Sequence, residues 1–167
     1  GPLISKLQFD KVQRLIQAGI DEGATLVCGG IGRPQGLNHG WFVKPTIFGH
    51  VKNQMTISRE EIFGPVLSVL TFRTPAEAIE KANNSPYGLS AGIWSDKGSR
   101  ILWTAKQLRA GVIWANTFNK FDPASPFGGY KESGWGREGG RHGLAGYLKG
   151  ETKMRIDVMK TYKLFIN

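Results

Sequence analysis

The sequence of 167 residues contains one cysteine, Cys28. A lone cysteine excludes an internal disulfide framework and a zinc site built from four thiolates. No apolar run approaches the roughly 18 residues that a membrane-spanning helix needs, and residues 1–4 have neither the basic start nor the apolar core of a signal peptide. We therefore expect a cytoplasmic protein without a membrane partner.

Acidic residues are scarce relative to basic ones: 13 Asp and Glu stand against 22 Lys and Arg, which gives a formal net charge of +9. Such a charge suggests nucleic acid first, because phosphate binders are rich in Lys and Arg. Those proteins gather their basic residues in runs or on one face, whereas here most are single and interleaved with acids. We predict no nucleic-acid partner, and a basic binding module remains an alternative hypothesis.

The composition is that of a folded domain. Hydrophobic residues make up 40% of the chain and aromatic residues 11%, which is enough to bury a core. The length fits one domain of ordinary size. The 23 glycines are about twice the usual share, so several functional turns or loops are expected.

Apolar residues alternate between helical spacing and short strand-like runs. Helices are expected over residues 6–22, 75–83, 97–108 and 138–148, and strands over 25–28, 41–48, 66–72, 89–94, 112–115, 152–158 and 161–166. Strands and helices that alternate through short links predict an α/β fold with a mostly parallel sheet and flanking helices.

Local signals support three of these helices. Ser5-Lys6-Leu7-Gln8 has the form of a capping box, in which the Ser side chain accepts a backbone N–H and the Gln side chain reaches back. Thr74-Pro75-Ala76-Glu77 predicts a second capped start, and Ser95 or Asp96 is expected to cap a third.

The apolar run 66–72 is typical of a strand that is buried on both faces.

Two segments carry the densest chemistry. In Glu60-Glu61-Ile62-Phe63-Gly64-Pro65 a carboxylate could accept hydrogen bonds from vicinal ribose hydroxyls, and the aromatic ring could pack on a planar ring. The same pattern is also compatible with a plain turn into a strand. The glycine-rich loop 116–137 follows the apolar strand 112–115 and carries three phenylalanines that could line an apolar pocket.

Seven motifs together resemble the C-terminal part of an NAD(P)-dependent aldehyde dehydrogenase, in the order and spacing of that family over residues 1–148. They are Gly1-Pro2-Leu3-Ile4, Cys28-Gly29-Gly30, Pro45-Thr46-Ile47, residues 60–65, Asn83-Asn84-Ser85-Pro86-Tyr87-Gly88-Leu89, residues 111–116 and Ser125-Pro126-Phe127-Gly128-Gly129-Tyr130-Lys131. The resemblance implies that 1–148 is part of the catalytic domain and that 149–167 is a C-terminal oligomerisation strand or tail.

The resemblance also implies roles for individual residues. Glu61 would hold the nicotinamide-side ribose of NAD or NADP, and Phe63 would pack beside the nicotinamide. Phe121 and Phe127 would line the pocket of an apolar or aliphatic aldehyde. The substrate loop would be shaped by Asn116 and by Ser125-Pro126, and no metal is implied.

Glu138 has two interpretations. It matches a position where many family members carry an acidic residue proposed for proton relay. It is equally well explained as a capping or salt-bridged residue at the start of a helix.

The chain departs from the family at its chemical centre. In the family a cysteine thiolate attacks the aldehyde, and water activated by a glutamate hydrolyses the resulting thioester. The resemblance places that cysteine, the glutamate and the dinucleotide-binding domain before the Gly1-Pro2-Leu3 stretch. Cys28 instead matches a strand-end packing position and is expected to be buried and inert, while His39, His50 and His142 are expected in loops or at the surface.

Both ends of the chain have the character of internal sequence, and residues 160–167 resemble the beginning of an aldehyde dehydrogenase. We therefore expect a fragment, which could derive from a tandem protein, of an oxidoreductase that works as a dimer or tetramer. The isolated chain is expected to be inactive. The alternative is a non-catalytic module of the same fold that serves in structure or interaction.

Overall fold

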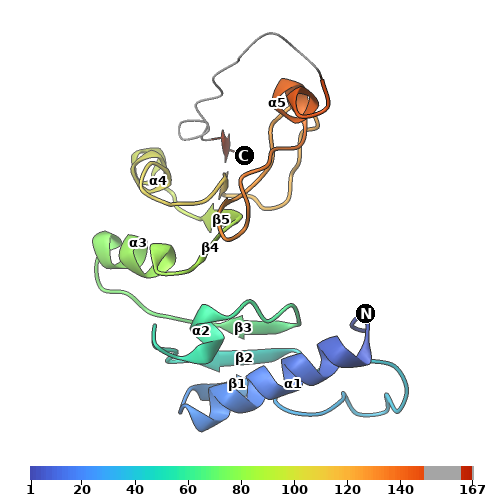
Figure 1. Ribbon diagram of the computed structural model, residues 1–167. Helices are drawn as coiled ribbons and strands as arrows, with labels where there is room; N and C mark the ends of the chain where they lie inside the picture. The colour runs from blue at the N-terminus through green and yellow to red at the C-terminus, as the bar shows by residue number, and fades with distance from the viewer. Residues whose placement is uncertain (149–162, 167) are drawn as a thin grey trace. The chain divides into compact units, whose positions relative to one another are not determined.

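The computed structural model describes residues 1–148 and the backbone of residues 163–166. The chain has an α/β fold and divides into two compact units, Gly1–Arg73 and Thr74–Asn167 (Figure 1). Each unit is described by itself. The boundary expected between residues 148 and 149 falls at the edge of the described part.

The first unit begins with helix α1, Lys6–Asp21. Ser5 caps it as predicted, because the Ser5 Oγ accepts the Gln8 N–H at 3.2 Å. The second half of the expected capping box is wrong: the Gln8 side chain binds carbonyls of residues 62 and 63 instead. Gly23, with φ +83°, follows the helix in the left-handed conformation that glycine adopts without steric cost.

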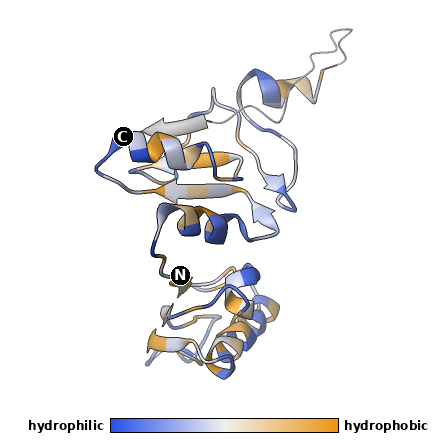
Figure 2. Cartoon of the chain, turned by 90° about the vertical axis from the view of Figure 1, so that its left-hand side faces the viewer, coloured by the Kyte–Doolittle hydropathy of each residue, from blue (hydrophilic) through white to orange (hydrophobic). Residues whose placement is uncertain are grey.

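A three-stranded sheet completes this unit, in the order β1 (Thr25–Cys28), β2 (Thr46–Gly49), β3 (Val66–Ser68). The β1 and β2 strands are antiparallel, and β2 and β3 are parallel. Hydrophobic and hydrophilic residues alternate along α1 (Figure 2), and its apolar side chains Val12, Leu15 and Ile16 pack in one cluster with Phe48 of β2.

The prediction that strand 66–72 is buried on both faces is wrong. Val66 and Leu70 pack against the core of the first unit, whereas Leu67 is 57% exposed and Val69 is 40% exposed. The alternation has the two-residue period of a sheet with one covered face. An apolar run cannot distinguish the two cases when the outward residues are also apolar.

A short helix in the first unit, α2 (Thr56–Arg59), is not among the helices expected from the sequence. Its first turn is capped from a distance by Glu22, which follows α1. The carboxylate accepts the Thr56 N–H at 2.7 Å and the Thr56 Oγ1–H at 2.5 Å. The helix is therefore stabilised by a tertiary contact that its own sequence does not contain.

The second unit carries the other helices and strands of the described residues: α3 (Pro75–Asn83), β4 (Tyr87–Gly88), β5 (Ser90–Ile93), α4 (Gly98–Ala105), β6 (Val112–Ala115), β7 (Tyr130–Lys131), α5 (Gly140–Ala145) and β8 (Lys163–Ile166). The β5, β6 and β8 strands form a parallel sheet in that order, and β4 pairs with β7 antiparallel. Every residue of the central strand β6 is buried.

Thr74 caps α3 as predicted, through its Oγ1 and the Glu77 N–H at 3.2 Å. The cap expected for the next helix is wrong, because α4 begins at Gly98 without a side-chain cap. The Ser95 main chain is bound by the Asn116 amide, which accepts the Ser95 N–H at 2.9 Å and donates to the Ser95 carbonyl at 3.0 Å.

The last helix and the tail differ in part from expectation. The α5 helix is shorter than the expected 138–148, since it covers Gly140–Ala145. The β8 strand lies within the expected strand 161–166 and pairs with β6. The strand expected over 152–158 and most of the proposed tail lie outside the described residues.

Candidate active-site segments

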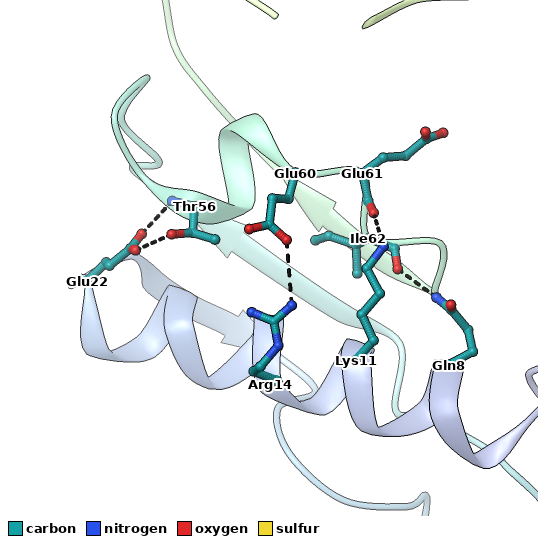
Figure 3. A network of polar contacts seen from close by, with 8 residues as sticks. All are labelled: Gln8, Lys11, Arg14, Glu22, Thr56, Glu60, Glu61 and Ile62. Atoms are coloured by element: carbon teal, nitrogen blue, oxygen red, sulfur yellow. Dashed lines mark hydrogen bonds and ion pairs between the residues drawn. The ribbon is translucent and has the colours of Figure 1, made fainter. Parts of the chain in front are cut away.

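The backbone of residues 61–63 is bound by side chains of α1 (Figure 3). The Lys11 ammonium donates to the Glu61 carbonyl at 2.9 Å. The Gln8 amide donates to the carbonyls of Ile62 and Phe63 at 3.0 and 3.1 Å. Three consecutive carbonyls are thus fixed by two side chains that stand one helical turn apart.

Phe63 has φ +56°, in the left-handed region that a residue with a Cβ rarely adopts. Its ring is 67% exposed, and the Lys11 ammonium lies 5.9 Å from the ring centroid. Gly64 follows, and a Cβ there would lie 2.8 Å from a methyl group of Val12. Glycine therefore allows this segment to lie directly on α1.

The two adjacent carboxylates of this segment have different surroundings. Glu60 faces Arg14 of α1, with 3.7 Å between the charged atoms. The Glu61 carboxylate is directed away from α1 (Figure 3) and has no hydrogen bond or ion pair within the described residues. Glu61 is therefore the carboxylate that is available for an external hydrogen-bond donor.

In the second unit, the loop after β6 builds an aromatic cluster on a buried base. Trp114 is fully buried, and its ring lies 5.2 Å from that of Phe121 and 6.0 Å from that of Phe118. Phe121 is also edge-on to Phe127 at 5.1 Å. Because Phe121 is 56% exposed, the cluster presents a partly open apolar surface.

Ser125 is only 5% exposed, and its hydroxyl donates to the Asp122 carboxylate at 2.5 Å. The other oxygen of Asp122 accepts the Ala124 N–H at 3.0 Å. These bonds make residues 122–125 a compact turn. In this turn the Ser125 side chain stabilises the loop itself.

Phe127 and Glu138 form an isolated antiparallel bridge, with hydrogen bonds of 2.7 and 2.8 Å between their main chains. Glu138 is exposed and precedes Gly139, the N-cap of α5. Within the described residues its carboxylate neither caps a helix nor forms an ion pair. The aldehyde-pocket candidate and the proton-relay candidate are therefore adjacent in the backbone.

Two basic side chains that fix the loop, Lys131 and Arg137, were missed in the sequence. Lys131 Nζ donates to the carbonyls of Asn83 and Ser85 at 2.9 and 2.8 Å, and Asn83 in turn accepts the Arg109 N–H. Burial, and secondarily the charge of Arg109, lowers the pKa of Lys131 below its ordinary value.

The second missed side chain, Arg137, donates through Nη1 to the carbonyls of Gly129, Trp135 and Gly136. Its guanidinium also lies 5.3 Å from the Tyr130 ring. Basic residues in a glycine-rich loop were the available signal, but none of their acceptors is a charged side chain.

The expectation that Cys28 is buried is wrong. Cys28 is exposed, and its sulfur lies 3.9 Å from the Pro45 carbonyl. All four residues of β1 are exposed, so the strand-end position does not place the side chain in the core. His39 and His50 are exposed as expected, whereas His142 is half-buried in α5.

Residues 1–148 contain no group of three His, Cys, Asp or Glu side chains that could hold a metal ion. None of the helices in the described part of the chain is long and apolar enough to cross a membrane.

Comparison with known proteins gives one consistent result. The model of the aldehyde dehydrogenase family matches residues 1–153. The chain is 50% identical over 149 residues to a putative aldehyde dehydrogenase, DhaS, from Bacillus subtilis, a match that covers 89% of this chain and 30% of the relative.

Solved structures agree. An aldehyde dehydrogenase from Mycobacterium tuberculosis complexed with NAD+ matches with a TM-score of 0.86 and 48% identity. A mutant of aldehyde dehydrogenase C from Pseudomonas syringae, complexed with NAD+ and octanal, matches with a TM-score of 0.86 and 46% identity. Both matches cover 89% of this chain and 30% of the solved chain. The chain thus spans about a third of the length of the proteins that it resembles, and it belongs to the aldehyde dehydrogenase family.

Proposed function

We propose that the chain is part of an oxidoreductase that converts an aldehyde to a carboxylic acid with NAD(P)+. Family membership supports the reaction class, and the NAD+ complexes of similar proteins support the cofactor. When bound, NAD(P)+ takes up the two electrons that leave the aldehyde. Water supplies the second oxygen of the acid.

The segment 60–63 fits the nicotinamide half of such a cofactor. An ionised carboxylate can accept two hydrogen bonds from vicinal hydroxyls, and Glu61 has no competing partner within the described residues. The exposed ring of Phe63 offers a face on which a planar ring can pack. Because their backbone is fixed by α1, both side chains would meet the cofactor with little loss of main-chain entropy.

Phe121 and Phe127 would contact the aldehyde. Phe127 is edge-on to Phe121, which is edge-on to Trp114, and these aromatic rings form an apolar surface that suits a hydrocarbon substituent. The octanal complex of a similar enzyme supports an aliphatic substrate. Asn116 and Ser125 would hold the loop in shape through the Ser95 main chain and Asp122.

Glu138 would take or give a proton during the reaction, since its carboxylate is exposed and makes no hydrogen bond or ion pair within the described residues. Cys28 is not proposed as the nucleophile. No base lies within hydrogen-bond reach of its sulfur among the contacts of the described residues, where the one acceptor is a main-chain carbonyl. We therefore propose that the isolated chain has no turnover.

Further proposals follow from the family. Residues 1–148 would belong to the catalytic domain and residues 149–167 to an oligomerisation segment of a cytoplasmic dimer or tetramer. The single observation that carries the proposed function is the match of 89% of the chain to aldehyde dehydrogenases at about half identity.

The test compares the purified 167-residue chain with the full-length protein that carries it. Formation of NADH or NADPH would be followed by absorbance with octanal as substrate. We expect turnover by the full-length protein and none by the chain. Turnover by the chain would contradict the proposal of inactivity, and the absence of turnover with any aldehyde by a cofactor-binding full-length protein would favour the non-catalytic module.

A further inference from the structure

The central strand β6 has two neighbours, and one of them lies outside the part of the chain that aldehyde dehydrogenases share. The family model matches residues 1–153, which include β5 but not β8. The β8 strand nevertheless pairs with β6 along its whole length, from Val112 opposite Lys163 to Ala115 opposite Ile166. One side of a fully buried strand is therefore covered by a segment that family membership does not explain.

The main-chain N–H groups of this strand are divided between its two neighbours. Those of Val112 and of Asn116, which follows β6, donate to carbonyls on the β5 side at 3.2 and 2.8 Å and are called the β5-side amides. Peptide groups along a strand point alternately to its two sides, so the N–H groups of Ile113 and Ala115 point toward β8 and are called the β8-side amides. The β8 main chain is thus the neighbour that these two amides face.

The β8-facing edge of β6 needs a strand beside it. Ile113 and Ala115 are 2% and 0% exposed, and buried main-chain N–H and C=O groups are nearly always paired. A bare edge on an apolar strand also pairs readily with other chains. A protein that contains only the shared part of the chain therefore needs a different strand at this edge. The chain covers 30% of a relative such as DhaS, so the remaining length of such a protein can supply that strand.

We propose that β8 is an autoinhibitory strand, because it occupies the edge of β6 to which an apolar strand from the rest of the full-length protein is added in the active enzyme. One edge accepts one strand, so the two pairings exclude each other. The incoming strand is apolar because its cross-strand neighbours are the four buried residues of β6. This inference rests on the proposed function, in that the chain works as part of a longer oxidoreductase. While β8 is bound to β6, it also cannot take part in the subunit contacts proposed for residues 149–167.

Phe165→Pro is the variant that releases β8. Ile113 lies opposite Leu164 and Ala115 opposite Ile166, so the Phe165 main chain stands between these pairs and faces β6. Proline at this position has no N–H to donate and removes a bond of the ladder. Leu164→Pro is the matched control, because the Leu164 N–H points to the outer side of β8, the last strand of the sheet in the described part of the chain. Deletion of residues 163–167 is a second release variant, should Phe165→Pro fail to fold.

Hydrogen exchange of individual amides in the 167-residue chain measures whether β8 holds the edge. We expect Phe165→Pro to speed exchange of the β8-side amides at least about tenfold and to leave the β5-side amides within about twofold of wild type. Leu164→Pro should leave both pairs of amides unchanged. Unchanged exchange of the β8-side amides in the release variants would overturn the proposal.

The full-length protein that carries this chain tests the competing strand. There we expect the β8-side amides of Phe165→Pro to stay protected within about twofold of wild type, because the incoming strand takes the edge. Formation of NADH with octanal should rise several-fold in Phe165→Pro and should stay at the wild-type level in Leu164→Pro. Loss of protection in the full-length variant, or unchanged turnover of an active protein, would overturn the autoinhibitory role.

Two further outcomes have distinct meanings. Protection of the β8-side amides that falls on dilution would assign the edge to a second copy of the chain and would also overturn the proposal. Absence of turnover in wild type and variants alike would contradict the proposed function. In that case the exchange of the β8-side amides in the full-length variant would still decide whether another strand takes the edge.

Discussion

Phe127 and Glu138 are joined by two main-chain hydrogen bonds, from the Phe127 N–H to the Glu138 carbonyl at 2.7 Å and from the Glu138 N–H to the Phe127 carbonyl at 2.8 Å. The bridge closes the glycine-rich loop by its backbone alone. Neither side chain is needed for closure, so both remain available for other contacts. A side-chain substitution at either residue can therefore test the function of that side chain while the main-chain bridge still closes the loop.

Glu138→Gln tests that separation. The substitution removes the charge but leaves the main-chain bridge, and the exposed Glu138 carboxylate makes no ion pair within the described residues. We expect the free energy of unfolding of the chain to change by less than about 0.5 kcal/mol. In the full-length protein we expect kcat to fall about 10²-fold or more if the carboxylate moves a proton.

The two measurements on Glu138→Gln divide the interpretations of this residue. A clear loss of stability would support the salt-bridge or capping interpretation. Unchanged kcat with unchanged stability would contradict a proton relay. Gln is isosteric with Glu, so packing is matched in both measurements.

Phe121→Ala tests the aromatic cluster. Phe121 makes edge-on contacts with both Trp114 and Phe127, each worth about 0.5–1.5 kcal/mol beyond simple burial. Because the ring is half-exposed, we expect a loss of only about 1–2 kcal/mol in the free energy of unfolding. In the full-length protein the KM for octanal should rise several-fold with little change in the KM for NAD+.

Phe118→Ala is the matched control for Phe121. Phe118 is 52% exposed and contacts Trp114, so it resembles Phe121 in exposure. We expect a smaller loss of stability and no change in the KM for octanal. Equal effects of the two substitutions on that KM would show that a general loosening of the loop, and not contact with the aldehyde, is responsible.

Elements with local causes could be predicted from the sequence. The starts of α1 and α3 depend on Ser5 and Thr74, whose side chains bind N–H groups three residues away, and both were predicted. The central strand β6 was predicted because its four residues are apolar and lie between a glycine and an asparagine. The α2 helix was missed because its cap comes from Glu22, far away in the sequence.

The candidate site likewise contains residues that the sequence could identify and residues that it could not. Glu61 and Phe63 could be identified by motif, because residue type and order are local. The contacts of Gln8 could not be identified from the sequence. Its spacing from Ser5 fits a capping box, but its amide donates to carbonyls of distant residues. Sequence patterns show which residues can donate, and only the fold decides to which acceptor they do.

Glu22→Ala tests the cap on α2. The substitution removes both acceptors of Thr56 and the negative charge at the start of the helix. We expect a loss of about 1–2 kcal/mol in the free energy of unfolding, as for a missing N-cap. Amide hydrogen exchange should become faster at residues 56–60.

Asp21→Ala is the control for the cap. Asp21 neighbours Glu22, but within the described residues its carboxylate accepts only the Gln17 amide, at the surface. We expect a change below about 0.5 kcal/mol and no faster exchange in α2. Faster exchange in both variants would mean that the end of α1, and not the cap, controls α2.

Lys131→Met tests the lysine that fastens β7 to the end of α3. The substitution removes two hydrogen bonds to carbonyls and should lower the free energy of unfolding by about 1–3 kcal/mol near pH 8. The control Lys120→Met, at an exposed lysine, should show no such loss.

Because burial lowers the Lys131 pKa, the folded chain holds fewer protons than the unfolded chain between that lowered pKa and the ordinary value of 10.5. The contribution of Lys131 to stability should therefore rise with pH up to about 10.5, and the neutral amine still has two N–H donors for the two carbonyls. Denaturant unfolding of wild type and variant at pH 8 and pH 10 measures the difference. A difference that shrinks as pH rises would show that the charge of Lys131, and not its hydrogen bonds alone, stabilises the fold.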